Sequence, residues 1–201
     1  MHGELFSTKA SVGKKHPTIV LAHGWGGVQA SLRPEAVAFA EAGYLALTFD
    51  YRGWGASDSK LILAARRMPS GVKNWRFTGE VQAVREVVDP SEMVTDWLNA
   101  IAFVAGEPQC DKDRIGLWGS SLSGGLVLSA AERDPRVKAI HSQVPGMQGW
   151  WSVATPAARA AMETETTKRA RGKLGYPELG AMSGSPAAAL SFSIRKLVAG
   201  R

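Results

Sequence analysis

Three short, mostly apolar segments, each followed at once by a glycine-rich loop, constrain the fold of this chain more than any other feature. They span residues 18–22, 44–49 and 114–118. Segments of this length and character are typical of parallel strands buried on both faces of a sheet. A fourth apolar segment, residues 137–144, ends at Pro145-Gly146. We therefore expect four strands.

The stretches between these segments have the patterns of helices. Residues 34–42 begin with Pro34 and stop before Gly43, which are typical helix boundaries. A second helix is expected over residues 122–133, because an apolar run there ends at Asp134-Pro135.

A third helix has the clearest start signal. Asp89 is a good N-cap, Pro90 occupies the first helical position, and Glu92 is placed to complete a capping box. One apolar stripe at helical spacing follows, formed by Met93, Trp97, Ile101 and Val104. Strands that alternate with helices predict an α/β fold with a mostly parallel sheet flanked by helices.

Length and composition fit one domain over residues 1–201, because 201 residues with 45% hydrophobic content can bury a single sizeable core. No apolar run reaches the roughly 18 residues of a membrane span. The N-terminus also lacks a basic segment followed by an apolar one. Cys110 is the only cysteine, which excludes an intramolecular disulfide. These features predict a cytoplasmic protein that does not bind membranes.

The net charge of +6 does not by itself indicate nucleic acid as a partner. Basic residues are scattered apart from residues 168–173, where a solvated helix end is favoured over an anion-binding patch. The signatures of RNA-binding modules and zinc fingers are absent. No paired His or Cys spacing, P-loop or dinucleotide fingerprint is present. We therefore predict no nucleic acid partner, no metal and no cofactor.

The loop at residues 119–125 has the pattern of a catalytic serine turn. The carboxyl ends of parallel strands meet at one sheet edge, so this loop and those after residues 22 and 49 are expected together. Its sequence, Gly-Ser-Ser-Leu-Ser-Gly-Gly, places Gly119 two residues before Ser121, with Ser123 where the G-x-S-x-G motif has its second glycine. Ser121 is the candidate nucleophile. A glycine- and serine-rich turn without catalysis is the alternative.

The other two loops are expected to support this serine. Glycines in residues 23–27 allow close backbone approach, so the N–H groups of Trp25 and Leu122 are candidates for an oxyanion hole. For His23 a hydrogen-bonded structural role is favoured over that of a base. In the loop of residues 50–58 we expect Asp50 and Arg52 to pair and brace the backbone rather than supply a catalytic acid.

Together, these three loops resemble those of the α/β-hydrolase superfamily in order and spacing. The Gly-Ser-Ser-Leu-Ser-Gly-Gly turn and the later Asp-Pro-Arg-Val-Lys-Ala-Ile are most similar to the dienelactone-hydrolase-like and X-Pro-peptidase-like branch, which contains bacterial esterases. The resemblance covers residues 16–180 and implies a cofactor-free serine hydrolase of small-molecule esters or similar acyl bonds. It also implies that residues 59–88 and 146–190 border or cap the pocket.

The chain departs from this pattern in its triad. The superfamily places an acid and then a histidine after the nucleophile. After Ser121 the only histidine is His141, and the acids between them, Glu132 and Asp134, are expected at the opposite sheet edge. For His141, a place in or beside the core is favoured over a non-standard base or an interface role.

The chain also ends before the two further strands that carry the acid and histidine in that superfamily. We therefore expect a shortened sheet whose exposed edge, at residues 137–144, pairs in a homo-oligomer. A partner subunit is then a possible source of the histidine. Two functions remain open: a Ser121-dependent esterase, or a non-catalytic domain that binds or oligomerises.

Overall fold

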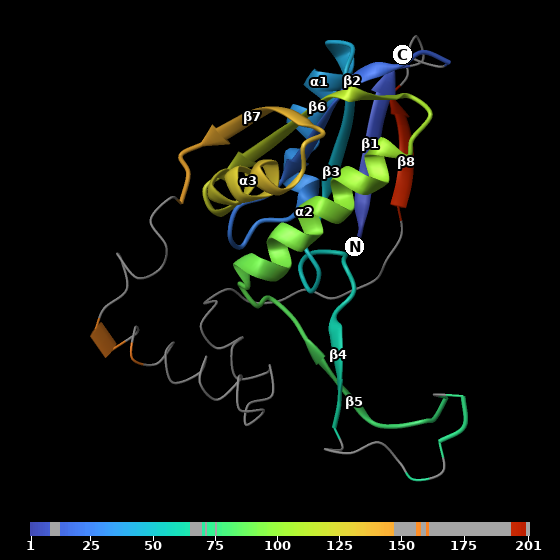
Figure 1. Ribbon diagram of the computed structural model, residues 1–201, viewed down its shortest axis with the longest axis vertical. Coiled ribbons are helices and arrows are strands. Elements are labelled where there is room, and N and C mark those ends of the chain that lie inside the picture. The colour runs from blue at the N-terminus through green and yellow to red at the C-terminus, as the bar shows by residue number, and fades with distance from the viewer. Residues whose placement is uncertain are drawn as a thin grey trace.

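A mostly parallel sheet forms the centre of the computed structural model, which describes residues 1–8, 13–64, 70, 72–74, 76–146, 156–157, 160 and the backbone of 194–199 (Figure 1). Its strands follow the order β7-β6-β2-β3-β1-β8. Their bounds are β1 Gly3–Thr8, β2 His16–Ala22, β3 Leu45–Phe49, β6 Cys110–Ser120, β7 Val137–Gln143 and β8 Ile194–Ala199. Strands β2, β3, β6 and β7 run parallel, whereas β1 is antiparallel to β3 and β8 is parallel to β1.

Helices cover both faces of this sheet, which confirms the predicted fold class. On one face lie the short 3-10 helix η2, Gln29–Leu32, and α1, Arg33–Glu41. On the other lie α2, Pro90–Ala105, and α3, Leu122–Arg133 (Figure 1). Each layer has its own apolar core, and the larger one, under α2 and α3, surrounds the buried ring of Trp97. Burial of apolar surface on both faces is the main stabilising term of such a fold.

The register of the central strands brings their loops together. Ala22 at the end of β2 pairs with Phe49 at the end of β3 and with Gly119 near the end of β6. The loops that begin at residues 23, 50 and 121 therefore leave the same edge of the sheet at the same level, as expected.

Two strands of the central sheet, β1 and β8, were not predicted from the sequence because their patterns are weak. Strand β1 is buried up to its half-buried last residue, Thr8, yet contains polar residues, and its Glu4 carboxylate is neutralised by Arg33. Strand β8 lies beyond β1, in a part of the chain for which the sequence predicted no strand. Within the described residues β7 is the other edge strand, as predicted for this segment.

The stretch of residues 59–88 contains an antiparallel hairpin of β4, Lys60–Leu63, and β5, Val81–Val84. Figure 1 shows this hairpin extending away from the central sheet. Backbone hydrogen bonds at Gly53, to Asp58 and from Glu86, attach its base to the loop after β3. Residues 146–190 fall outside the described residues, apart from Gly146, 156–157 and 160. Among the described helices, none combines the length and apolar character that crossing a membrane requires.

The first turn of α2 is capped by the side chain of Asp89. The Asp89 carboxylate accepts the N–H groups of Ser91 at 3.1 Å and Glu92 at 3.3 Å, which confirms the predicted N-cap. The Glu92 carboxylate itself accepts from Lys60 at 2.6 Å.

We expect Asp89→Ala to lower the free energy of unfolding by about 1 kcal/mol, because two helix N–H groups lose their acceptor. Urea denaturation followed by circular dichroism measures this loss. Asp113→Ala, at an exposed position of β6, is the matched control. Equal effects of the two substitutions would contradict the capping role.

Candidate active site

Ser121 occupies a strained position in the tight turn between β6 and α3. Its backbone has φ 56° and ψ −118°, in the left-handed half of the map that residues with a Cβ rarely adopt. Strand β6 ends one residue before it and α3 begins one residue after it. The residue is exposed, so this turn presents the Ser121 side chain at the sheet edge where the loops meet.

Close backbone packing explains the glycines of this turn. A Cβ on Gly119 would lie 2.4 Å from the Ser123 carbonyl oxygen, and one on Gly124 would lie 2.7 Å from that of Gln143. Real Cβ atoms do not approach backbone this closely, so side chains at these positions would force α3 away from β6 and β7.

The end of β7 and the segment after it hold the Ser121 backbone from the other side. The Ser121 N–H donates to the Gln143 carbonyl at 2.9 Å, and the Gly146 N–H donates to the Ser121 carbonyl at 2.9 Å. Val144, between them, has φ 38°, which is unusual for a β-branched residue, and is 75% exposed. Sequence analysis missed this second strained residue, because nothing in a valine indicates positive φ.

The loop after β2 lies directly against Ser121. A Cβ on Gly24 would lie 3.2 Å from the Ser121 Cβ and 3.8 Å from its Oγ. Trp25 follows Gly24, and its side chain is 40% exposed. Leu122 is the first residue of α3, where an N–H group has no acceptor within the helix. The two amides predicted for an oxyanion hole thus belong to the backbone segments that flank the Ser121 side chain.

Asp50, at the end of β3, braces the neighbouring loops instead of acting beside Ser121. Its carboxylate accepts the N–H of Gln29 at 2.7 Å and that of Ala56 at 3.0 Å. The predicted ion pair between Asp50 and Arg52 is wrong. Arg52 instead binds the buried Asp96 of α2, with 2.6 Å between its Nη2 and Oδ1. The distance in sequence between Arg52 and Asp96 explains why local reasoning missed the pair.

His23 is buried and its ring is directed into the structure. Its Nδ1 donates to the Gly24 carbonyl at 2.8 Å, and its Nε2 lies 3.6 Å from the Asp50 carboxylate. Burial lowers the pKa of His23, although Gly24 and Asp50 act in the opposite direction. A neutral, inward-facing imidazole fits the structural role that the sequence favoured.

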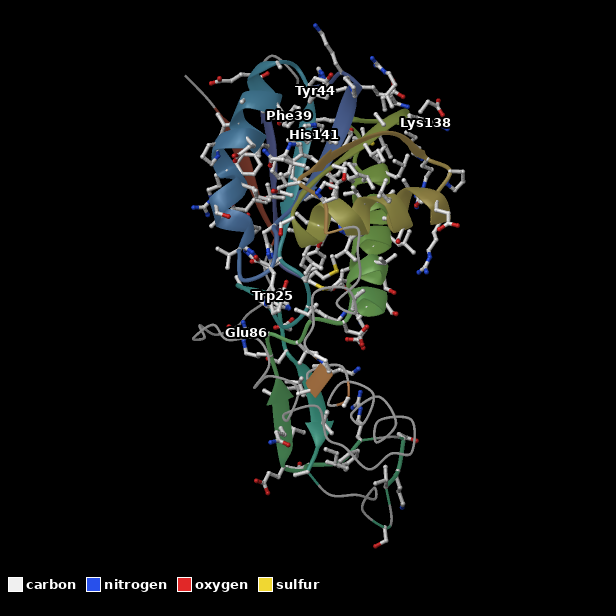
Figure 2. All side chains as sticks on the ribbon, turned by 90° about the vertical axis from the view of Figure 1, so that its left-hand side faces the viewer. Trp25, Phe39, Tyr44, Glu86, Lys138 and His141 are labelled. Carbon is white, nitrogen blue, oxygen red and sulfur yellow. The ribbon has the colours of Figure 1, made fainter. Side chains whose placement is uncertain are left out.

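The remaining histidines lie away from the Ser121 hydroxyl. His141 is exposed on β7, pairs in register with Trp118 and stacks on its ring with 5.8 Å between centroids. Figure 2 shows His141 and Trp25 well apart along the strands. His16 binds the Gly43 carbonyl at the opposite sheet edge, and His2 faces Asp50. Within the described part of the chain, no histidine hydrogen-bonds Ser121, so His141 as a base stays a prediction without support from this geometry.

The two acids between Ser121 and His141 lie near the end of α3 that is far from Ser121, as expected. Asp134 is buried at the end of α3 and pairs with Arg136, whose side chain lowers the pKa of this carboxyl. Glu132 is exposed on the last turn of α3. Among the described residues, no group of three His, Cys, Asp or Glu side chains could hold a metal ion.

Tryptophans contribute less to the site surface than their number suggests. Trp54 is buried and donates its indole N–H to the Val87 carbonyl at 3.2 Å, and Trp118 packs against the core under α1. Trp150 and Trp151 fall outside the described residues. Among the described tryptophans only Trp25 is exposed, and it directly follows Gly24, which packs against Ser121.

Tyr51 and Ser123 have roles in the site that the sequence did not predict. The Ser123 hydroxyl donates to the His23 carbonyl at 2.5 Å and is hydrogen-bonded to the Tyr51 hydroxyl. The Tyr51 oxygen also accepts the indole N–H of Trp97 at 2.9 Å. A serine in place of the motif's second glycine was the signal that could have found this arrangement.

Comparisons with known proteins agree with this fold. The quorum-quenching protein AidA of Acinetobacter baumannii is 31% identical over 173 residues, which are 84% of this chain and 46% of that protein. An uncharacterized 31.7 kDa protein of Escherichia coli, from the traX-finO intergenic region, is 38% identical over 136 residues, 67% of this chain and 39% of that protein. This chain thus spans less than half the length of these curated relatives.

A solved structure shows the same fold. The α/β hydrolase GrgF from Penicillium sp. sh18 matches with a TM-score of 0.57 and 23% identity, over 84% of this chain and 50% of that one. The family model of the acetyl xylan esterases (AXE1) matches residues 2–163. The chain therefore belongs to the acetyl xylan esterase (AXE1) family, within the α/β-hydrolase fold.

Proposed function

We propose that this chain carries the nucleophile and the oxyanion hole of a serine hydrolase that acts on carboxylic esters or similar acyl bonds. One observation carries the proposal: the left-handed backbone of Ser121 presents its side chain between the start of α3 and the loop of Gly24. A strained strand–turn–helix serine of this kind is the arrangement that acyl-transfer enzymes of this fold use. Membership of an esterase family supports the same reaction class.

In the proposed reaction, the Ser121 Oγ attacks the acyl carbonyl carbon and loses its proton to a base. The carbonyl oxygen becomes an oxyanion, which the N–H groups of Trp25 and Leu122 stabilise. The oxyanion then re-forms the carbonyl, the bond to the leaving alcohol breaks and the base gives its proton to that alcohol, which leaves the acyl group on Ser121. Water releases this acyl group as a carboxylic acid and restores the Ser121 hydroxyl. Trp25 offers an exposed aromatic surface for an apolar part of the substrate.

The base is the open part of this mechanism. All four histidines of the sequence lie within the described residues, and none binds the Ser121 hydroxyl there. We propose that a partner subunit supplies the histidine base. Because an oxyanion hole alone retains part of an enzyme's rate enhancement, slow hydrolysis without that base is also expected.

This same arrangement of histidines favours a second candidate function, a domain that keeps the fold but only binds or oligomerises. The two candidates differ in the reactivity of Ser121. A fluorophosphonate labels a serine only when the serine is activated, so labelling separates a catalytic from a non-catalytic domain.

We propose that this chain forms homo-oligomers through β7. Within the described residues, β7 pairs only with β6, and it exposes Ile140, which is 42% accessible. An unpaired strand edge with an apolar residue favours pairing with a second copy of the same chain. The small-molecule ester is the other proposed partner. The predicted cytoplasmic location rests on the sequence alone.

Ser121→Ala should abolish hydrolysis of p-nitrophenyl acetate, with a loss of at least about 100-fold in rate, because the acyl group loses its acceptor. Spectrophotometric release of p-nitrophenol measures the rate. Ser91→Ala, on the exposed first turn of α2, is the control and should keep the rate. Equal rates for the native chain and Ser121→Ala would refute the proposed nucleophile.

Gly24→Ala should reduce the rate of p-nitrophenyl acetate hydrolysis by about 10- to 100-fold while the chain still folds. The reason is that a methyl group at this position would push the loop away from Ser121. The Cβ would lie 3.1 Å from the Ser120 carbonyl oxygen. At Gly116 of β6 the nearest atom would lie at an ordinary 3.6 Å, so Gly116→Ala is the matched control. If Gly24→Ala and Gly116→Ala behaved alike in the assay, the loop would not form part of the site.

Ile140→Lys should shift the mass measured by light scattering toward that of a monomer, because a buried lysine would oppose pairing along β7. Leu61→Lys, which replaces an exposed apolar residue of the β4–β5 hairpin, should leave the mass unchanged. A native chain that is monomeric at micromolar concentration would contradict this interface.

A further inference from the structure

A line of buried polar groups connects α2 to the loop beside Ser121. Trp97 of α2, Tyr51 after β3 and Ser123 in α3 are all buried, and their polar atoms follow one another by hydrogen bonds. The last member is the backbone carbonyl of His23, which accepts from the Ser123 hydroxyl at 2.5 Å. We call this set of four groups the polar line.

Donor chemistry fixes the direction of every hydrogen bond in the polar line. A carbonyl only accepts, so the single proton of the Ser123 hydroxyl points to His23. Tyr51 must then donate to Ser123, and the Trp97 indole, which only donates, bonds the Tyr51 oxygen. Burial raises the pKa of Tyr51, so its phenol stays protonated and keeps donating. Each proton in the polar line therefore has one acceptor, which gives a single ordered arrangement.

The polar line ends at the loop whose position beside Ser121 matters for the proposed reaction. His23 precedes Gly24, whose Cα packs against Ser121, and Trp25 with its candidate oxyanion amide comes next. Glycine has no side chain with which to fix the loop. A hydrogen bond to the preceding carbonyl restrains the peptide chain at the point where it enters the site.

On these grounds we infer that Ser123 is a positioning residue, whose hydroxyl, aligned by Tyr51 and Trp97, fixes the loop of residues 23–27 beside Ser121. This inference rests on the proposed function, because its catalytic consequence requires the oxyanion hole. The second glycine of the G-x-S-x-G motif could not supply this hydrogen bond. The replacement of that glycine by Ser123 thus adds a specific restraint to the site.

The test compares two serines whose hydroxyls bind a backbone carbonyl near the start of α3. Ser123→Ala removes the bond to His23, and Ser142→Ala removes a 2.6 Å bond between β7 and the Gly124 carbonyl. Two readouts are measured for both variants. One is hydrogen–deuterium exchange in peptides covering residues 23–27, and the other is kcat and KM for p-nitrophenyl acetate.

Ser123→Ala should raise exchange at residues 23–27 and lower kcat by about 10-fold or more with KM within about twofold, because a misplaced amide weakens transition-state stabilisation more than substrate binding. Ser142→Ala should change neither. Tyr51→Phe should have an intermediate effect, because Ser123 keeps its bond to His23 but loses its alignment. If Ser123→Ala fails to fold, Tyr51→Phe against Ser142→Ala decides the question in the same two readouts.

The exchange readout separates this inference from the proposed function. If hydrolysis persists in Ser121→Ala, the proposed function fails, and exchange at residues 23–27 alone decides whether Ser123 positions the loop. Exchange and kcat in Ser123→Ala that match those of Ser142→Ala would overturn the inference.

Discussion

The turn between β6 and α3 depends on one backbone constraint, the left-handed conformation of Ser121. This conformation is unfavourable for any residue with a Cβ and persists only where the surroundings over-determine it. Here the Ser121 N–H is bonded to the last residue of β7 and its C=O to the segment after β7, and α3 packs too closely on its neighbours to admit side chains at Gly119 and Gly124. The packing of α3 and β7 thus stabilises the strain that presents the Ser121 side chain.

Around this turn, buried polar groups fix the conformation of the neighbouring loops through hydrogen bonds and ion pairs that the sheet itself does not provide. Asp50 accepts N–H groups from two segments that are distant in sequence, and Arg52 joins the loop after β3 to Asp96 of α2. Breaking such a buried pair leaves one polar or charged group without its partner, which costs free energy. The pairs therefore favour a single arrangement of the loops. The site is therefore held by contacts from α2, β3 and β7 as well as by the turn itself.

The sequence predicted those parts of the fold that depend on local patterns. Apolar runs and helix boundaries located the central strands and the three helices, and Asp89 indicated the start of α2. Strand β1 was missed because its burial depends on Arg33 neutralising Glu4, a contact across 29 positions. Arg52 was assigned to the wrong partner for the same reason. The roles of Tyr51 and Ser123 depend on hydrogen bonds between segments that only the folded sheet brings together.

The most direct test of the central claim is a crystal structure of this chain after treatment with a phosphonate that forms a covalent bond to activated serines. The account predicts an adduct on the Ser121 Oγ, with the phosphonyl oxygen about 2.7–3.1 Å from the amide nitrogens of Trp25 and Leu122. An adduct elsewhere, no adduct on Ser121, or an oxygen directed away from both amides would contradict it.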